Sequence, residues 1–569
     1  MIGMLMMNHR YLCLGLPTLL IAIFGYLHCA PIQAQFDPQR VFPQNDLVKA
    51  RYPDPDITYT TPGFRPGRKD FTSHTEMLTF IETLQKQTPV VGIRFIGHSQ
   101  EGRQIPALVL TTLAHKDASE LQKSGRPIVM IAGLQHGNEP AGGEAMLVLA
   151  QALATGHLRP LLERLTVIIV PHSNPDGAYY FRRSPYSTID MNRDHVKVDL
   201  PETRALHQLV NDYQPHVFID AHEFSVATRW VEKFGVIQSY DLMLQYATHP
   251  NVDPALTTLA DQTFLPALRQ DIDRAGYKPF WYYTTSYNLS SRLVAMGGTI
   301  PDIGRNFAGL QHAVSFLVES RGVGIGRDSF KRRVHSHMIA ITSLLQTAAD
   351  HAPLLMTTVA TARASVIARG LIPQPHDTIA VTLNSPVVKQ NLTMLEPSSG
   401  ELKQIEVDWS DSLAATPALS RQRPYAYIMP PVFHDVALRL QQSGVQVMRL
   451  ARPTTLPVES YRVTDRKTSG TYIEGRLTSQ VTTETVQKQV QFPAGSYVYM
   501  MGQVNANVLA VALEPESPSS FVTFGWIPVD KQGSPATIAA SSEIPIYRLL
   551  KPMTLDVQTL RDYKFTQPD

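Results

Sequence analysis

Cysteine is almost absent from this chain of 569 residues. Its two cysteines, Cys13 and Cys29, both lie near the start. A chain that begins after them forms no disulfide and offers no thiolate to a metal ion. Any metal site in the remaining chain would therefore use histidine and carboxylate ligands.

An excess of charge of one sign is also missing. Lysine and arginine number 51 against 49 aspartates and glutamates, which leaves a formal net charge of +2. Nucleic-acid binding depends on a strongly basic surface, so no nucleic-acid partner is expected. Hydrophobic residues make up 43% of the chain, which is typical of an ordinary folded protein rather than a disordered one.

Long apolar runs are rare, and the main one lies at the start. The uncharged residues 11–27 follow the basic pair His9-Arg10 and precede small residues near Ala34. This order predicts a signal peptide over residues 1–34. An uncleaved membrane anchor is the alternative, but Gly15 and Pro17 interrupt the run. We therefore expect a secreted or periplasmic protein without stable membrane insertion.

The remaining chain divides by pattern. Residues 35–70 are rich in proline and predict an extended N-terminal arm. In residues 71–355 short apolar segments alternate with helical ones, which predicts an α/β fold with helices on both faces of a sheet. Residues 356–372 are expected to be a linker. Residues 373–569 alternate polar and apolar residues and predict a second, β-rich domain of unknown role.

One turn stands out as a candidate site. The apolar residues 127–132 predict a buried strand, residues 142–153 predict a helix, and His136 and Glu139 lie between them. Open α/β sheets place their sites at the carboxyl ends of strands. An imidazole and a carboxylate aimed at one point suit Zn²⁺, which in a catalytic site needs a third protein ligand and a position for water.

Polar residues also follow later apolar segments. His222 follows the apolar segment 217–220, and Glu319 directly follows the apolar segment 314–318. With His222 as third ligand, Glu319 could take a proton from the water. Each residue alone has an ordinary interpretation, such as a half-buried histidine or a surface ion pair between Glu319 and Arg321. Their order along the chain favours a site.

With these residues in this order, the sequence resembles the zinc metallocarboxypeptidases of the carboxypeptidase A type, over about residues 70–350. The signal-like start, the absence of later cysteines and the C-terminal extension are similar to secreted bacterial members. The matching pieces, in order, are Gly97-His-Ser-Gln-Glu-Gly-Arg103, His136-Gly-Asn-Glu139, Asn174-Pro-Asp-Gly177, Asp190-Met-Asn192-Arg193-Asp194, Asp220-Ala-His222 and Phe316-Leu-Val-Glu319.

The resemblance implies a mixed β-sheet and a site with one Zn²⁺ per chain. It implies that His136, Glu139 and His222 bind the metal and that Glu319 is the general base. The substrate would be the C-terminus of a peptide or protein. No feature of the sequence indicates an oligomeric state.

The resemblance also implies roles for the segment between the metal ligands. Asn192 and Arg193 would bind the terminal carboxylate of the substrate, and Asp190 would hold the tautomer of His136. The arginine that polarises the scissile carbonyl would be Arg183, with Arg182 as the alternative.

One feature departs from the family. Pancreatic-type members carry a mobile tyrosine before the general-base strand, but this chain has no tyrosine between Tyr287 and Glu319. Tyr287 and Arg305 are the two candidates to replace it.

Other functions stay open from the sequence alone. A hydrolase of amide bonds in peptidoglycan stem peptides would use the same zinc chemistry with a different pocket. A deacylase of small acylated amino acids could use the same metal motif. An inactive, peptidase-like binding module is the alternative outside enzymes.

Overall fold

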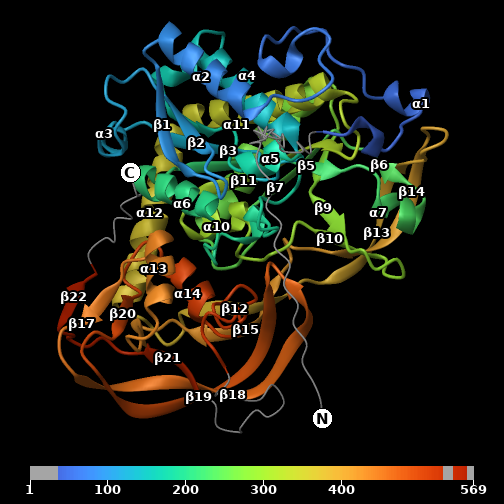
Figure 1. The fold of residues 1–569 in the computed structure, drawn as a ribbon. Helices are drawn as coiled ribbons and strands as arrows, with labels where there is room; N and C mark the ends of the chain where they lie inside the picture. Colours follow the sequence, from blue (N-terminus) through green and yellow to red (C-terminus); the bar gives the residue numbers. More distant parts are fainter. Residues whose placement is uncertain (1–35, 530–542, 561–569) are drawn as a thin grey trace, which may run out of the picture.

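The computed structural model describes residues 36–529 and 543–560. The predicted signal peptide and both cysteines lie outside these residues. A mixed α/β part and a β-rich C-terminal part are both present (Figure 1), which confirms the predicted fold class. None of the helices within the described ranges is both long and apolar enough to span a membrane.

The α/β part is built on an eight-stranded mixed sheet. Its middle four strands are β4, β3, β5 and β11, which run parallel to one another, while its other pairs are antiparallel except β7 and β8. The strand order is β1 (Val91–His98), β2 (Gln104–Leu110), β4 (Thr166–Val170), β3 (Ile128–Gly133), β5 (Val217–Ser225), β11 (Val314–Val323), β7 (Leu242–Tyr246) and β8 (Pro279–Trp281).

Helices cover both faces of this sheet because its buried strands are apolar on both sides. Along β3, Val129 and Ile131 face a core with α2, α4, α9 and α11, whereas Met130 and Ala132 face a core with α3, α6 and α10. The helices are α1 (Asp46–Lys49), α2 (His74–Gln87), α3 (Ala118–Lys123), α4 (Pro140–Ala154), α5 (Pro175–Tyr179), α6 (Pro201–Tyr213), α7 (Arg229–Phe234), α8 (Pro254–Leu259), α9 (Leu265–Arg274), α10 (Gly304–Leu310), α11 (Phe330–Asp350), α12 (Ala352–Leu371), α13 (His434–Gln442) and α14 (Ala506–Leu513).

The segment between the two predicted domains is helical. Residues 356–371 of the expected linker lie in helix α12, which contacts α8 and α11 of the α/β part and α14 of the C-terminal part. The expected linker therefore packs against both parts of the chain. Before β11, the chain also forms β9 (Tyr283–Thr285) and β10 (Leu293–Met296).

Strands that follow residue 373 share a sheet with strands of the α/β part. The hairpin β13 (Val387–Leu395) and β14 (Leu402–Ser410) joins β6 (Ile237–Gln238), β10 and β9 in one five-stranded sheet. The other strands form a two-stranded and a seven-stranded sheet. They are β12 (Thr378–Asn384) and β15 (Thr416–Gln422), then β19 (Arg476–Phe492), β18 (Thr454–Ile473), β21 (Glu543–Leu549), β16 (Ala426–Met429), β20 (Tyr497–Met500), β17 (Met448–Leu450) and β22 (Val557–Thr559).

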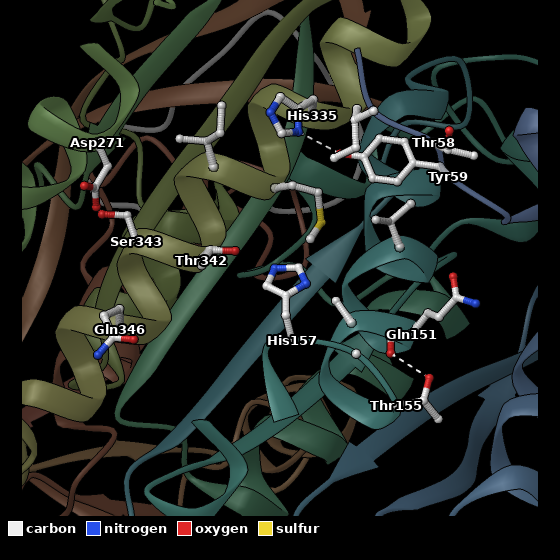
Figure 2. A pocket seen from close by; sticks show the side chains of 16 residues that line it. Thr58, Tyr59, Gln151, Thr155, His157, Asp271, His335, Thr342, Ser343 and Gln346 are labelled. Atoms are coloured by element: carbon white, nitrogen blue, oxygen red, sulfur yellow. Dashed lines mark hydrogen bonds between the residues drawn. The ribbon is translucent and has the colours of Figure 1, made fainter. Parts of the chain in front are cut away.

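The N-terminal arm packs on the α/β part. Tyr52 donates its hydroxyl to the carbonyl of Ser239 at 2.7 Å, and Tyr59 bonds His335 on α11 at 2.7 Å. A cavity of about 720 Å³ lies between the arm, α4 and α11 (Figure 2). Its lining includes the C-terminal end of α4, whereas Glu139 precedes the N-terminal end of that helix, so this cavity is separate from the candidate site.

The end of the arm is fixed by an ion pair with two parallel hydrogen bonds. Arg68 donates from Nη1 and Nη2 to the two carboxylate oxygens of Glu76 at 2.7 and 2.8 Å. Glu76 also completes the capping box that starts α2 at Ser73. The hydrogen bonds from Arg68 lower the pKa of Glu76 to about 2, although partial burial acts in the opposite direction.

This pKa predicts a pH-dependent contribution to stability. Because the folded-state pKa lies below the 4.5 of an unperturbed glutamate, the stabilisation is present above pH 4.5 and is lost as the pH falls toward 2. We expect Glu76→Gln to lower the free energy of unfolding by about 2 kcal/mol at pH 7. Urea unfolding at pH 7 and pH 3 measures it, with the exposed Glu82→Gln on the same helix as control. A loss of equal size at both pH values would contradict the assignment.

Candidate active site

The four parallel strands bring the predicted residues to one edge of the sheet. His136 and Glu139 lie in the turn between β3 and α4, and His222 and Glu319 lie in the C-terminal halves of β5 and β11. The register pairs Glu319 directly with His222 across the two strands. Paired residues on neighbouring strands share a face, so these two side chains lie next to each other.

Two histidines and one carboxylate converge at this edge. His136 Nδ1 lies 2.8 Å from one oxygen of Glu139, and His222 Nδ1 lies 2.8 Å from the other. The two Nδ1 atoms are 3.1 Å apart. All three side chains are buried, and among the described residues they form the one group of three that could hold a metal ion.

The second nitrogen of each histidine is held by a carboxylate. His136 Nε2 lies 2.9 Å from Asp190 Oδ1, and His222 Nε2 lies 2.7 Å from Asp220 Oδ1. Such contacts fix the imidazole tautomers and leave both Nδ1 atoms to face the ligand position. Two imidazole nitrogens and a carboxylate oxygen are a donor set that Zn²⁺ prefers, so the residues present fit the metal that the sequence predicts.

Asp190 connects several members of the site. Its Oδ2 accepts from Arg183 Nε at 2.9 Å, and its Oδ1 accepts from the backbone N–H of Asn192 at 2.8 Å. Burial alone would raise the pKa of Asp190, but His136 and Arg183 hold it well below its usual range. The carboxylate thus stays ionised and keeps its partners in place.

Glu319 is buried, with 6% of the residue exposed, and its carboxylate forms no hydrogen bond with any described residue. Burial raises its pKa, and the Glu139 carboxylate acts in the same direction while His222 opposes both. A carboxylate of this kind is suited to accept and return a proton.

The structure distinguishes between the two candidate arginines. Arg183 lies at the site, with Nη1 3.5 Å from Glu139 Oε1. Arg182 instead places its guanidinium 4.5 Å from the ring centroid of Tyr180. Asn192 is buried and accepts the N–H of Gly304 at 2.6 Å, and the neighbouring Arg193 is partly exposed.

Comparison with known proteins gives the family. Residues 77–233 match the family described as zinc carboxypeptidase, Peptidase_M14. A protein named Carboxypeptidase 2 from Trichophyton equinum is 34% identical over 79% of this chain and 81% of the relative. Carboxypeptidase 2 from Trichophyton rubrum is 33% identical over 86% of this chain and 88% of the relative. The chain belongs to the zinc carboxypeptidase family. It is therefore a metallocarboxypeptidase, as the sequence predicted.

Solved structures with similarity to this zinc carboxypeptidase carry related names. A metallo-carboxypeptidase from Burkholderia cenocepacia aligns with a TM-score of 0.38 and 18% identity, over 49% of this chain and 70% of that chain. Carboxypeptidase A from Helicoverpa armigera aligns with a TM-score of 0.38 and 19% identity, over 50% of this chain and 75% of that chain.

The zinc carboxypeptidase has a tyrosine at the site that the sequence did not single out. Tyr282 follows β8, and its pKa is raised by burial and by the charge of Glu319, while Arg193, Arg183 and Arg305 oppose the shift. Tyr287 is 73% exposed and lies under Arg229. The cluster of aromatic residues around Trp281 was the available signal, but its pattern did not indicate which ring faces the site.

A second residue at the site of this zinc carboxypeptidase comes from the C-terminal part. Glu474 and Gly475 form the turn between β18 and β19, and both have positive φ, 47° and 75°. Glu474 Oε2 accepts the backbone N–H of Asp190 at 2.7 Å. Next to it, Arg476 lies 3.4 Å from Asp199. The hairpin thus supports the segment that carries Asp190, and nothing in the local sequence indicated this contact.

Proposed function

We propose that this zinc carboxypeptidase releases single residues from the C-termini of peptides or proteins, with one Zn²⁺ held by His136, Glu139 and His222. One observation carries the proposal. Glu319 pairs with His222 in the strand register, and its buried carboxylate has no hydrogen-bond partner among the described residues. When bound, Zn²⁺ supplies a Lewis acid that lowers the pKa of water and polarises a carbonyl.

Substrate binding falls to the segment between β4 and α6. Arg193 is partly exposed, and its rigid fork suits the terminal carboxylate of a peptide. The neighbouring Asn192 accepts the N–H of Gly304 and so holds this segment in place. Tyr282, which interacts electrostatically with Glu319 and Arg193, takes the role of the family's mobile tyrosine, for which Tyr287 and Arg305 were the sequence candidates.

Glu319 moves the proton, and Arg183 stabilises charge. Glu319 accepts a proton from water as the water oxygen bonds to the scissile carbonyl carbon. Arg183 stabilises the negative charge that develops on the carbonyl oxygen. Glu319 then gives the proton to the leaving nitrogen as the C–N bond breaks, so the products are a shortened peptide and a free amino acid.

The proposal is tested with the purified protein and a panel of blocked dipeptides and longer peptides, with and without a chelator. We expect release of single C-terminal residues that stops on chelation and returns with Zn²⁺. Zinc-loaded protein that releases nothing from any peptide would overturn the proposal. Activity on purified murein instead would indicate the stem-peptide hydrolase, and zinc binding without hydrolysis of either would indicate a binding module.

The contact from Glu474 predicts an effect on this activity. Glu474→Ala removes the acceptor for the Asp190 N–H, and Asp190 in turn holds His136 and Arg183. Because partners of this kind orient metal ligands, we expect kcat/KM to fall by about 10-fold. Glu484→Ala is the matched control, since Glu484 pairs with Arg462 on the same hairpin. Equal activities of the two variants would contradict a role for Glu474.

A further inference from the structure

Beside the candidate site lies a buried cation without a counter-ion. Arg305 is the second residue of α10, directly after Gly304, whose N–H bonds Asn192. It is 3% exposed and forms no ion pair with any described carboxylate. Its Nη2 donates to the carbonyls of Gly297 and Gly298, the latter at 2.8 Å.

The rest of the Arg305 guanidinium has no protein partner in the described chain. Its Nε is buried without a hydrogen bond, and no hydrogen bond to Nη1 is formed by a described residue. Two carbonyl bonds fix the turn at Gly297, but they use only part of the five N–H donors of an arginine. Burial lowers the pKa of Arg305 to about 10, so the protein environment disfavours the charge that this residue carries.

A second orphaned polar group lies next to it. Gln245 on β7 is 1% exposed, and both its amide nitrogen and its amide oxygen are buried without a partner. A methyl group built on Gly297 would lie 3.0 Å from Arg305 Nη2 and 3.1 Å from Gln245 Cδ. The two side chains therefore flank the same glycine.

The strand register places Gln245 on the face that carries the catalytic residues. Leu317 pairs with Asp220 on one side and Gln245 on the other, while Glu319, two residues later, pairs with His222 and Met243. Residues two apart on a strand share a face. Gln245 thus lies one step deeper along the sheet than Glu319, on the same side.

Unpaired polar groups in a protein interior are costly, and an unpaired charge is the most costly of them. The other charged groups that face Arg305 do not neutralise it. Arg193 repels it, and Glu319 and Asp220 act on it only at a distance, without an ion pair. A ligand that brings a carboxylate to this place would complete the interactions of both Arg305 and Gln245.

We propose that Arg305 and Gln245 form the base of the pocket for the last side chain of the substrate and select an acidic one, glutamate or aspartate. The inference rests on the proposed function, in which Arg193 binds the terminal α-carboxylate. The C-terminal residue would then meet two arginines, one for its main-chain carboxylate and one for its side chain. Both carboxylates would be held on donors that the protein leaves free.

The first test compares C-terminal residues in the wild-type enzyme. Blocked peptides that differ only in the last residue, Glu, Asp, Gln, Leu or Lys, are assayed for release of the free amino acid. We expect kcat/KM for Glu or Asp to exceed that for Gln by about 100-fold, because a site built for a charged partner leaves its donors unpaired with the neutral analogue. Release of Leu, Gln or Lys at rates equal to Glu and Asp would overturn the inference.

The second test removes the charge. Arg305→Met keeps an unbranched side chain without the guanidinium, and we expect the ratio of kcat/KM for Glu over Gln to fall by about 100-fold. Gln245→Met should lower the same ratio less. Arg182→Met is the matched control, since Arg182 lies against Tyr180 and should leave the ratio as in the wild type.

Different outcomes would overturn the proposed function and the preference for an acidic C-terminal residue. If no peptide is hydrolysed by the zinc-loaded enzyme, the proposed function is wrong. If peptides are hydrolysed without preference for an acidic end, or if Arg305→Met retains the wild-type ratio, only the present inference is wrong. Should Arg305→Met not fold, as judged by circular dichroism and zinc content, the wild-type panel still decides.

Discussion

Replacing Glu319 by glutamine is expected to lower kcat/KM for C-terminal hydrolysis by about 10³-fold, the size typical of losing a positioned general base. Glutamine keeps the shape of the side chain but cannot accept a proton from water. Glu319 is paired with His222 on the neighbouring strand and is not itself one of the three converging ligands. Bound zinc should therefore stay at the wild-type level, and metal analysis alongside steady-state kinetics measures both quantities.

A buried glutamate away from the site provides the control. Glu144 on α4 accepts hydrogen bonds from Thr61 of the arm and from Thr72, and burial raises its pKa as well. Glu144→Gln should leave kcat/KM within about twofold of the wild type at temperatures where the protein is folded. If Glu319→Gln retained more than a tenth of the activity, the role as base would have to be abandoned.

Replacing His222 by alanine should abolish both metal binding and hydrolysis. His222 Nδ1 is one of three converging donor atoms, and a catalytic zinc site needs three protein ligands. We expect affinity for Zn²⁺ to fall by at least about 10³-fold, with activity at background. Zinc per chain after gel filtration in metal-free buffer, and titration with Zn²⁺, measure the change.

His335→Ala is a suitable comparison, because His335 bonds Tyr59 at the cavity between α4 and α11 (Figure 2). That variant should bind zinc as the wild type does. Full zinc occupancy in His222→Ala would show that the metal is held elsewhere, and the assignment of the ligand group would fail with it.

Much of the site could be predicted because its parts are local in the sequence. His136 and Glu139 lie three residues apart on one turn, and Asp190 and Asn192 lie two apart. The apolar segments that became β3, β5 and β11 are strong signals, and parallel strands end at a common edge. The structure brings His136, Glu139 and His222 together at that edge, as the sequence indicated.

What could not be predicted depends on contacts between distant segments. The local sequence does not indicate that β7 pairs with β11, so the position of Gln245 beside the site could not be predicted. The sequence offers Arg305 only as a substitute for a tyrosine, because its lack of a counter-ion appears only in the folded chain. Residues 356–372 lie between two sequence patterns, and this position alone does not indicate that they belong to helix α12.

The contact between Glu474 and Asp190 joins residues 284 positions apart in the chain. Synthesis on the ribosome runs from the N-terminus, so the proposed metal ligands and Glu319 are all made before the hairpin. A chain that ended after α11 would contain every proposed catalytic group but would lack the acceptor for the Asp190 N–H. The segment that carries Asp190 can therefore reach the arrangement seen in the structure only after the β18–β19 hairpin has been synthesised.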